Sequence, residues 1–353
     1  MNSRTEAFIA SRRIAENEPP YIVAELSANH GGSIDQALRL IAAAAESGAD
    51  AIKLQTYTAD TITLDHEGPE FIIPHGPWKG RTLHALYQEA HTPWDWHERL
   101  FAEARNCGLT IFSSPFDPTA VDLLESLDAP AYKIASFEIV DLPLIEKCAR
   151  TCKPLIISTG MASLGEIEAA ITTARGAGTT DLVLLHCISA YPTPAHEMDL
   201  RTVAHLGNAF DVVPGLSDHT LGTAVAVASV ALGARLIEKH FTLDRAEGGP
   251  DADFSIEPHE LKRLAADCRT AWEALGSVSY DPRGSERGNV AFRRSLYAVA
   301  DIAAGERLSV EKVRSIRPGH GLPPRELPRV LTGRARTPIT RGTPLSFDLI
   351  DFG

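Results

Sequence analysis

Two histidines stand at the ends of two apolar runs late in the chain. His219 follows the run Val212–Asp218, and His240 ends the run Ala234–His240. A lone histidine in such a place is more often a hydrogen-bonded structural residue than a metal ligand. Two on consecutive runs, each near an acidic residue that could orient the imidazole ring, favour a shared metal site. Two imidazoles with oxygen ligands suit Mn²⁺, Co²⁺, Fe²⁺ or Zn²⁺ acting as a Lewis acid.

Two lysines interrupt otherwise apolar runs. Lys53 lies in Ala-Ile-Lys-Leu-Gln, and Lys133 lies in Tyr-Lys-Ile-Ala-Ser. A buried lysine needs an anion or a carboxylate beside it. One interpretation pairs the lysines with Glu25 or Glu138; the other has them bind the phosphate or carboxylate of a substrate. The sequence leaves both open.

Hydroxyl groups follow the same runs and could complete an anion site. They belong to Ser113, Ser114, Ser136, Ser158 and Thr159. A single serine there is unremarkable, but five near two lysines predict a cradle for an oxyanion. Glu25 could serve as a general acid or base, or only as a lysine counter-ion.

Two loop residues complete the candidate site. Tyr191 follows the sixth run on a loop stiffened by Pro192 and Pro194, and Asp251 lies on a glycine-rich loop beyond the eighth. Such loops can close over a ligand. A solvated loop acid is the alternative for Asp251.

These residues lie at or just after the ends of eight short apolar runs, most of which precede a helix-like stretch. The runs are Tyr21–Glu25, Ala51–Gln55, Leu109–Ser113, Ala131–Ser136, Leu155–Thr159, Leu182–His186, Val212–Asp218 and Ala234–His240. Eight strand–helix units predict an α/β fold, a (β/α)8 TIM barrel, whose active site is built at the C-terminal ends of its strands. Helices are predicted over Ile34–Ala45, Leu164–Ala174 and Pro258–Leu275, the second with a capping box of Ser163 and Glu166.

The chain has 353 residues, more than one barrel needs. We expect an N-terminal arm or hairpin over 1–20, the barrel over 21–278, a linker over 279–290 and a small, mostly β domain over 291–353. Asp60–Trp96 is a long insertion after the second strand. Long insertions there often contact substrate.

Composition narrows the class of protein. A net charge of −12 without a basic face argues against nucleic-acid binding. No apolar stretch reaches the length of a membrane span, and the polar N-terminus does not resemble a signal peptide, so we expect a soluble cytoplasmic protein. Five cysteines without metal-ribbon spacing indicate a reducing compartment.

The motifs resemble the sialic acid synthase family over nearly the whole chain. They include Ala24-Glu25-Leu26-Ser27-Ala28-Asn29-His30, Lys133-Ile134-Ala135-Ser136-Phe137-Glu138, Gly215-Leu216-Ser217-Asp218-His219-Thr220 and Glu238-Lys239-His240-Phe241. The C-terminal domain resembles the antifreeze-like (SAF) domain through Ala304-Gly305-Glu306 and Arg317-Pro318-Gly319-His320-Gly321.

The resemblance implies a transferase that condenses phosphoenolpyruvate with an acetamido sugar. It implies metal binding by His219 and His240, with Mn²⁺ usual and Co²⁺, Mg²⁺ or another divalent ion as alternatives, and proton transfer or water positioning by Glu25. Phosphoenolpyruvate would be held by Lys53, Ser114, Lys133, Ser136, Ser158 and Ser189. The sugar would be held by Glu138, Tyr191, Asp251 and Arg317, the last reaching the other subunit of a domain-swapped homodimer.

Within the family, the chain most resembles the branch that makes pseudaminic acid. Phe71-Ile72-Ile73, Trp78 and Thr92-Pro93-Trp94-Asp95-Trp96-His97 contribute to this resemblance. Its sugar substrate would be 2,4-diacetamido-2,4,6-trideoxy-L-altrose. Ser189 stands where neuraminate synthases usually carry Asn, and Phe137 adds an apolar wall that suits a 6-deoxy sugar.

Other interpretations remain. The same chemistry on N-acetylmannosamine or on the legionaminic acid precursor would make the chain an N-acetylneuraminate or legionaminic acid synthase. Lys133 could instead form a Schiff base as an aldolase nucleophile. A non-catalytic SAF-type binding protein is the remote alternative, because it would not need lysines, histidines and acids at so many strand ends.

Overall fold

The computed structural model describes residues 6–353 and divides into two compact units, one running to Gly276 and the other from Ser277 to Gly353. Residues 1–5 of the predicted N-terminal arm lie outside the described residues. The two units are taken separately below.

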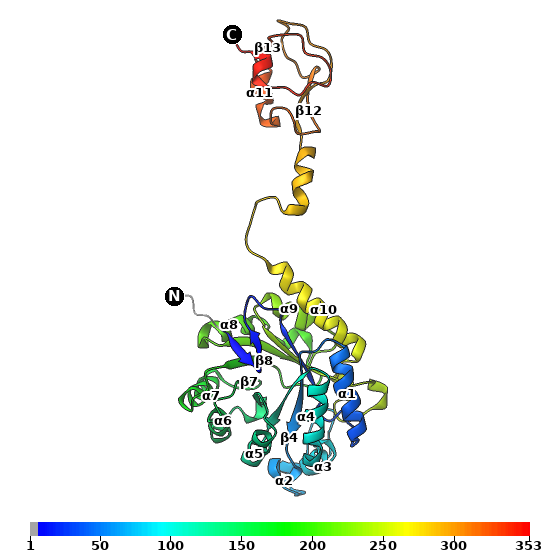
Figure 1. Ribbon diagram of the computed structural model, residues 1–353, viewed down its shortest axis with the longest axis vertical. Helices are drawn as coiled ribbons and strands as arrows, with labels where there is room; N and C mark the ends of the chain where they lie inside the picture. The colour runs from blue at the N-terminus through cyan, green and yellow to red at the C-terminus, as the bar shows by residue number, and fades with distance from the viewer. Residues whose placement is uncertain (1–5) are drawn as a thin grey trace. The chain divides into compact units, whose positions relative to one another are not determined.

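The first unit is a closed barrel of eight parallel strands in the order β10-β3-β4-β5-β6-β7-β8-β9, with the helices around it (Figure 1). The strands are β3 (Tyr21–Glu25), β4 (Ala51–Thr56), β5 (Thr110–Pro115), β6 (Tyr132–Ile134), β7 (Leu155–Ser158), β8 (Leu182–Cys187), β9 (Val213–Asp218) and β10 (Leu236–His240). Both ends of each strand fall within two residues of the ends of the predicted run. The predicted TIM barrel is confirmed.

The register of this barrel sets which strand-end residues are neighbours. His240 pairs with Glu25 across β10 and β3, and Glu25 pairs with Lys53 across β3 and β4. Three chemically capable residues, distant in sequence, therefore stand side by side because parallel strands present their carboxyl ends on one face.

Ten helices are described in the barrel unit. They are α1 (Ile34–Glu46), α2 (Ala59–Ile62), α3 (Leu83–Ala90), α4 (His97–Asn106), α5 (Pro118–Ser126), α6 (Leu142–Ala149), α7 (Leu164–Gly176), α8 (Arg201–Phe210), α9 (Ala224–Ala231) and α10 (Pro258–Leu275). Ser163 and Glu166 form the predicted capping box of α7, which satisfies backbone N–H groups that have no partner inside the helix. No helix within residues 6–353 is long and apolar enough to cross a bilayer.

An antiparallel hairpin closes the end of the barrel opposite the candidate site. It consists of β1 (Ala7–Ile9) and β2 (Arg12–Ile14). Ala7, Ile9 and Ile14 are buried in one apolar cluster with barrel-interior residues such as Val23 and Phe112. Water is thus excluded from the barrel floor.

The second unit is small and mostly β. It contains β11 (Ser295–Ala298) paired with β12 (Val313–Ile316), α11 (Leu327–Val330), and β13 (Arg334–Ala335) paired with β14 (Ile350–Asp351). Its own core buries ten side chains, including Leu296, Leu308 and Val330. A separate core in so short a segment agrees with the expected C-terminal β domain.

Candidate active site

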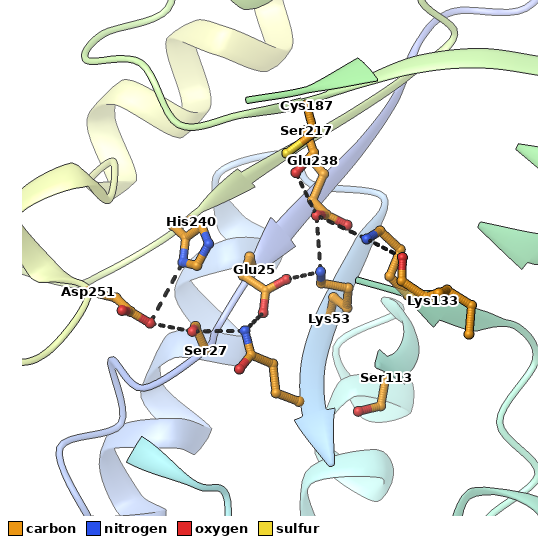
Figure 2. Close-up of polar contacts among 12 residues, drawn as sticks. Glu25, Ser27, Lys53, Ser113, Lys133, Cys187, Ser217, Glu238, His240 and Asp251 are labelled. Carbon is orange, nitrogen blue, oxygen red and sulfur yellow. Dashed lines mark hydrogen bonds and ion pairs between the residues drawn. The ribbon is translucent and has the colours of Figure 1, made fainter. Parts of the chain in front are cut away.

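A buried network of two lysines and two glutamates lies inside the barrel (Figure 2). Lys53 Nζ forms an ion pair with Glu25 Oε2 and lies 3.0 Å from Glu238 Oε1. Lys133 Nζ lies 4.0 Å from the same Glu238 oxygen, and Ser217 Oγ donates to it at 3.0 Å. Glu238 therefore joins the two lysines into one cluster.

The charged groups of this cluster change one another's pKa values. Burial lowers the pKa of Lys53 to about 8, although the adjacent Glu238 raises it. Burial alone would raise the pKa of Glu238, but Lys133 and Lys53 outweigh it and bring that pKa to about 2. The Glu238 carboxylate is therefore charged at neutral pH, as a partner of two lysines should be.

His219 and His240 lie together as predicted, with ring centroids 5.3 Å apart. His219 Nδ1 donates to the Ile188 carbonyl at 2.9 Å, which fixes the ring. Burial lowers the pKa of His240 well below its usual value. Burial also acts to lower the pKa of His219, but Cys187 and the Ile188 carbonyl outweigh it, so that pKa is raised.

The interpretation that the neighbouring acids orient these rings is wrong. Asp218 instead binds Lys239, with Asp218 Oδ2 2.9 Å from Lys239 Nζ, and Glu238 binds the lysines of the cluster. The carboxylate nearest His240 Nδ1 in the described contacts is Asp251, at 3.9 Å. Strand parity explains this for Asp218, which points away from the face that His219 occupies. Glu238 shares the face of His240, but its carboxylate is bound by Lys53 and Lys133.

The predicted serine cradle is smaller than five groups. Ser113 Oγ shares a hydrogen bond of 2.6 Å with Thr56, and Thr159 Oγ1 donates to the Leu185 carbonyl, so both have structural partners. Ser136 Oγ accepts from the Gly160 amide at 3.2 Å. Ser114, Ser158 and Ser189 are different, since each has a buried Oγ with no hydrogen-bond partner among residues 6–353. Such unpaired hydroxyls are the ones free to bind a ligand.

A cavity of about 420 Å³ lies beside this network. It is lined by Glu138, Tyr191, Asp251 and His240, among others, and thus by all three sugar-binding candidates of this unit. Burial raises the pKa of Glu138 to about 7, although Lys133 lowers it. Asp251 Oδ2 accepts from Ser27 Oγ and, at 3.3 Å, from the Ala28 amide, which tethers the loop after β10.

The remaining candidate, Arg317, belongs to the second unit. It follows β12 directly and its side chain is exposed. Its role at a barrel stays a prediction.

Sequence reasoning overlooked Glu238 as a site residue. The signal was present, because two inward lysines need two inward carboxylates and Glu238 has the same strand parity as His240. A separate cluster of Glu257, His259 and Glu260 at the start of α10 has metal-ligand residue types. Both glutamates of this cluster already bind Arg245, so we interpret the cluster as a group of surface ion pairs.

Comparisons with known proteins agree with the resemblance seen in the sequence motifs. The model of the NeuB family matches residues 40–280, and that of the SAF domain matches residues 293–351. The chain is 44% identical to the pseudaminic acid synthase of Helicobacter pylori over 95% of this chain and 98% of that protein. It is 39% identical to the N,N'-diacetyllegionaminic acid synthase of Campylobacter jejuni, covering 85% and 91%.

A solved structure supports the fold. The N-acetylneuraminic acid synthetase of Leptospira borgpetersenii, in complex with citrate, superimposes with a TM-score of 0.73 at 31% identity, over 81% of this chain and 95% of that one.

Proposed function

Because this chain belongs to the NeuB family, we propose that it is a pseudaminic acid synthase, which condenses phosphoenolpyruvate with 2,4-diacetamido-2,4,6-trideoxy-L-altrose. The pseudaminic acid synthase of H. pylori, similar over 95% of the chain, supports this activity. The structural observation that most supports this activity is that the two histidines lie beside the lysine–glutamate network on one face of the barrel.

The donor set at the histidines fits a divalent metal. His240 Nδ1 is buried and has no hydrogen-bond partner in the described part of the chain, and an unpaired imidazole nitrogen is a good ligand. His219 and His240 would hold the ion, and Mn²⁺ is our proposal. When bound, it would supply Lewis-acid polarisation of the sugar aldehyde.

Lys53 and Lys133, with the free hydroxyls of Ser114, Ser158 and Ser189, would bind phosphoenolpyruvate. Ser136 would add its hydroxyl, which already accepts from Gly160 and can still donate. The lysine ammonium groups are fixed by Glu25 and Glu238 before substrate arrives. Fixed cations of this kind stabilise developing charge without reorganising during the reaction.

The reaction then forms one carbon–carbon bond. C3 of phosphoenolpyruvate attacks the aldehyde carbon of the open-chain sugar, whose oxygen takes a proton, and an oxocarbenium-like centre forms at C2. Water adds to C2, and Glu25 would orient this water or take its proton. The C2–O bond to phosphate then breaks, and the nine-carbon 2-keto acid and phosphate leave.

Glu138, Tyr191 and Asp251 would contact the sugar in the cavity. Tyr191 packs its ring 4.4 Å from that of His219 between centroids, so the sugar-binding and metal-binding side chains support each other. Arg317 would complete the sugar site from the second unit of a partner in a domain-swapped homodimer. A cytoplasmic location and the boundaries 1–20, 21–278, 279–290 and 291–353 are part of the same proposal.

The deciding experiment measures phosphate release from phosphoenolpyruvate with Mn²⁺ and three sugars. We expect release with the diacetamido altrose sugar and none with N-acetylmannosamine or the legionaminic precursor. Release only with the legionaminic precursor would establish the second candidate, which the 39% identical legionaminic acid synthase favours. No release with any sugar would overturn the synthase proposal.

Borohydride separates this chemistry from a Schiff-base aldolase. Lys133 Nζ donates to the Ile134 carbonyl at 3.1 Å and lies 4.0 Å from Glu238 Oε1, so these two groups already occupy it. We expect no covalent adduct after borohydride treatment with pyruvate. An adduct on Lys133 would establish the aldolase instead.

A further inference from the structure

The cavity has two kinds of lining. His240, Asp251, Ser27 and Gln55 are polar residues of the strand ends and their loops, where Phe137 adds one apolar ring. The insertion after β4 instead contributes apolar side chains, Ile62, Ile73, Leu83 and Leu86, here called the insertion wall. An apolar surface in a site built for a sugar requires an explanation, because sugars present mainly hydroxyl groups.

The insertion wall is held in place by specific contacts. Ile73 N donates to the Arg81 carbonyl at 2.9 Å and Gly80 N donates to the Ile73 carbonyl at 2.8 Å, which forms a small hairpin. Trp78 Nε1 donates to the Pro250 carbonyl at 2.9 Å, and this bond fastens the hairpin to the loop after β10. Leu86 on α3 is 6% exposed. The wall is thus a built surface of the cavity.

We propose that the insertion wall is a subsite for the far end of the sugar, selecting a methyl group at C6 over a hydroxymethyl group. This rests on the proposed function. The aldehyde carbon must lie at His219 and His240, so the rest of the sugar chain extends from the polar strand ends towards the insertion. Burying a C6 methyl group against leucine and isoleucine side chains is favourable, because apolar surface leaves water. Burying a C6 hydroxyl group there is unfavourable, because its hydrogen bonds to water are not replaced.

The test compares two sugars that differ only at C6, the diacetamido altrose sugar and its 6-hydroxy analogue. For the unmodified chain we expect kcat/KM to favour the 6-deoxy sugar by on the order of 100-fold, the range that an apolar pocket gives against an added hydroxyl. Calorimetric binding of both sugars, without phosphoenolpyruvate, should show the same preference.

Two neighbouring isoleucines supply a matched pair of variants. Ile73 lines the cavity, whereas Ile72 on the same hairpin is 39% exposed and does not line it. Ile73→Thr should lower the preference by roughly tenfold and leave the KM for phosphoenolpyruvate unchanged. Ile72→Thr should keep the original preference. If Ile73→Thr fails to fold, Leu83→Gln makes the same test from α3.

The outcomes separate the subsite from the function. Equal affinity for the two sugars, or equal shifts in the two isoleucine variants, would overturn the subsite even if phosphate release stays normal. A 6-deoxy preference in binding without phosphate release would support the subsite and overturn the synthase reaction.

Discussion

Lys53 Nζ lies 3.0 Å from Glu238 Oε1 inside the barrel, and both side chains are almost fully buried. The pair joins β4 to β10, two strands that are not hydrogen-bonded neighbours, across the interior on which β3 also places Glu25. The binding site and the stability of the barrel therefore depend on the same charges.

Glu238→Gln should destabilise the chain strongly. It removes the carboxylate that two buried ammonium groups share, and breaking a buried pair typically costs about 3–5 kcal/mol. Urea denaturation measures the free energy of unfolding. Glu146→Gln, which breaks the exposed pair with Arg150, is the control and should cost less than about 1 kcal/mol. Equal losses in the two variants would contradict the central role of Glu238.

Adjacent serines on β5 should behave in opposite ways. Ser113 bonds Thr56, so Ser113→Ala should lower stability by about 1 kcal/mol. Ser114 Oγ has no partner in the described chain, so Ser114→Ala should leave stability unchanged and raise the KM for phosphoenolpyruvate about tenfold or more, the loss expected for a hydrogen bond to a charged group. A Ser114→Ala variant with normal kinetics would remove it from the cradle.

Metal binding should depend on two histidines and not on a third. His219→Ala and His240→Ala should each lose Mn²⁺ binding, measured by electron paramagnetic resonance, and chelation should abolish phosphate release until Mn²⁺ is restored. His186 is the control, because its Nε2 is hydrogen-bonded to the Met198 carbonyl at 2.5 Å. Unchanged Mn²⁺ binding in His240→Ala would refute the ligand assignment.

Arg317→Ala should raise the KM for the sugar more than that for phosphoenolpyruvate. Exposed Arg314 on β12 supplies the control, Arg314→Ala. If the second units are exchanged in a homodimer, Arg317→Ala chains, assayed at low sugar concentration, should gain activity when mixed with inactive His240→Ala chains, since one site per dimer is then intact. Mixtures no more active than the separate variants would reject the exchange.

Glu138 should give stability an unusual pH dependence. Burial raises its pKa from 4.5 to about 7 in the folded chain, so between these values the folded state binds more protons than the unfolded state. The free energy of unfolding therefore falls as the pH rises through that range. Relative to the original chain, Glu138→Gln should gain on the order of 2–3 kcal/mol between about pH 5 and pH 8. Urea denaturation at both pH values measures this change, and Glu168→Gln, at an exposed position, is the control. If Glu138→Gln shows no relative gain, the pKa of the Glu138 carboxyl is not raised in the folded chain.

The barrel was predictable because its signals are local. Each strand is a short apolar run that a helix follows, and Ser163 and Glu166 define the start of α7 within four residues. Closing eight such units then places His240, Glu25 and Lys53 together without further information. The proximity of the two histidines and of the lysines was predictable for this reason.

Partner choice was less predictable, because it depends on three-dimensional contacts. The sequence did not show that Asp218 would bind Lys239, or that the Ser113 hydroxyl would be hydrogen-bonded and the Ser114 hydroxyl unpaired. The insertion was recognised as a loop that could contact substrate. Which of its faces meets the cavity follows from the hairpin bonds and the link between Trp78 and Pro250.

The origin of the insertion wall in a single segment has an evolutionary consequence. The wall that meets the far end of the sugar comes from one contiguous segment, whereas the reacting groups come from strands distributed around the barrel. Substitutions confined to this one segment can therefore change the fit at the far end of the sugar while the residues of the condensation reaction stay the same.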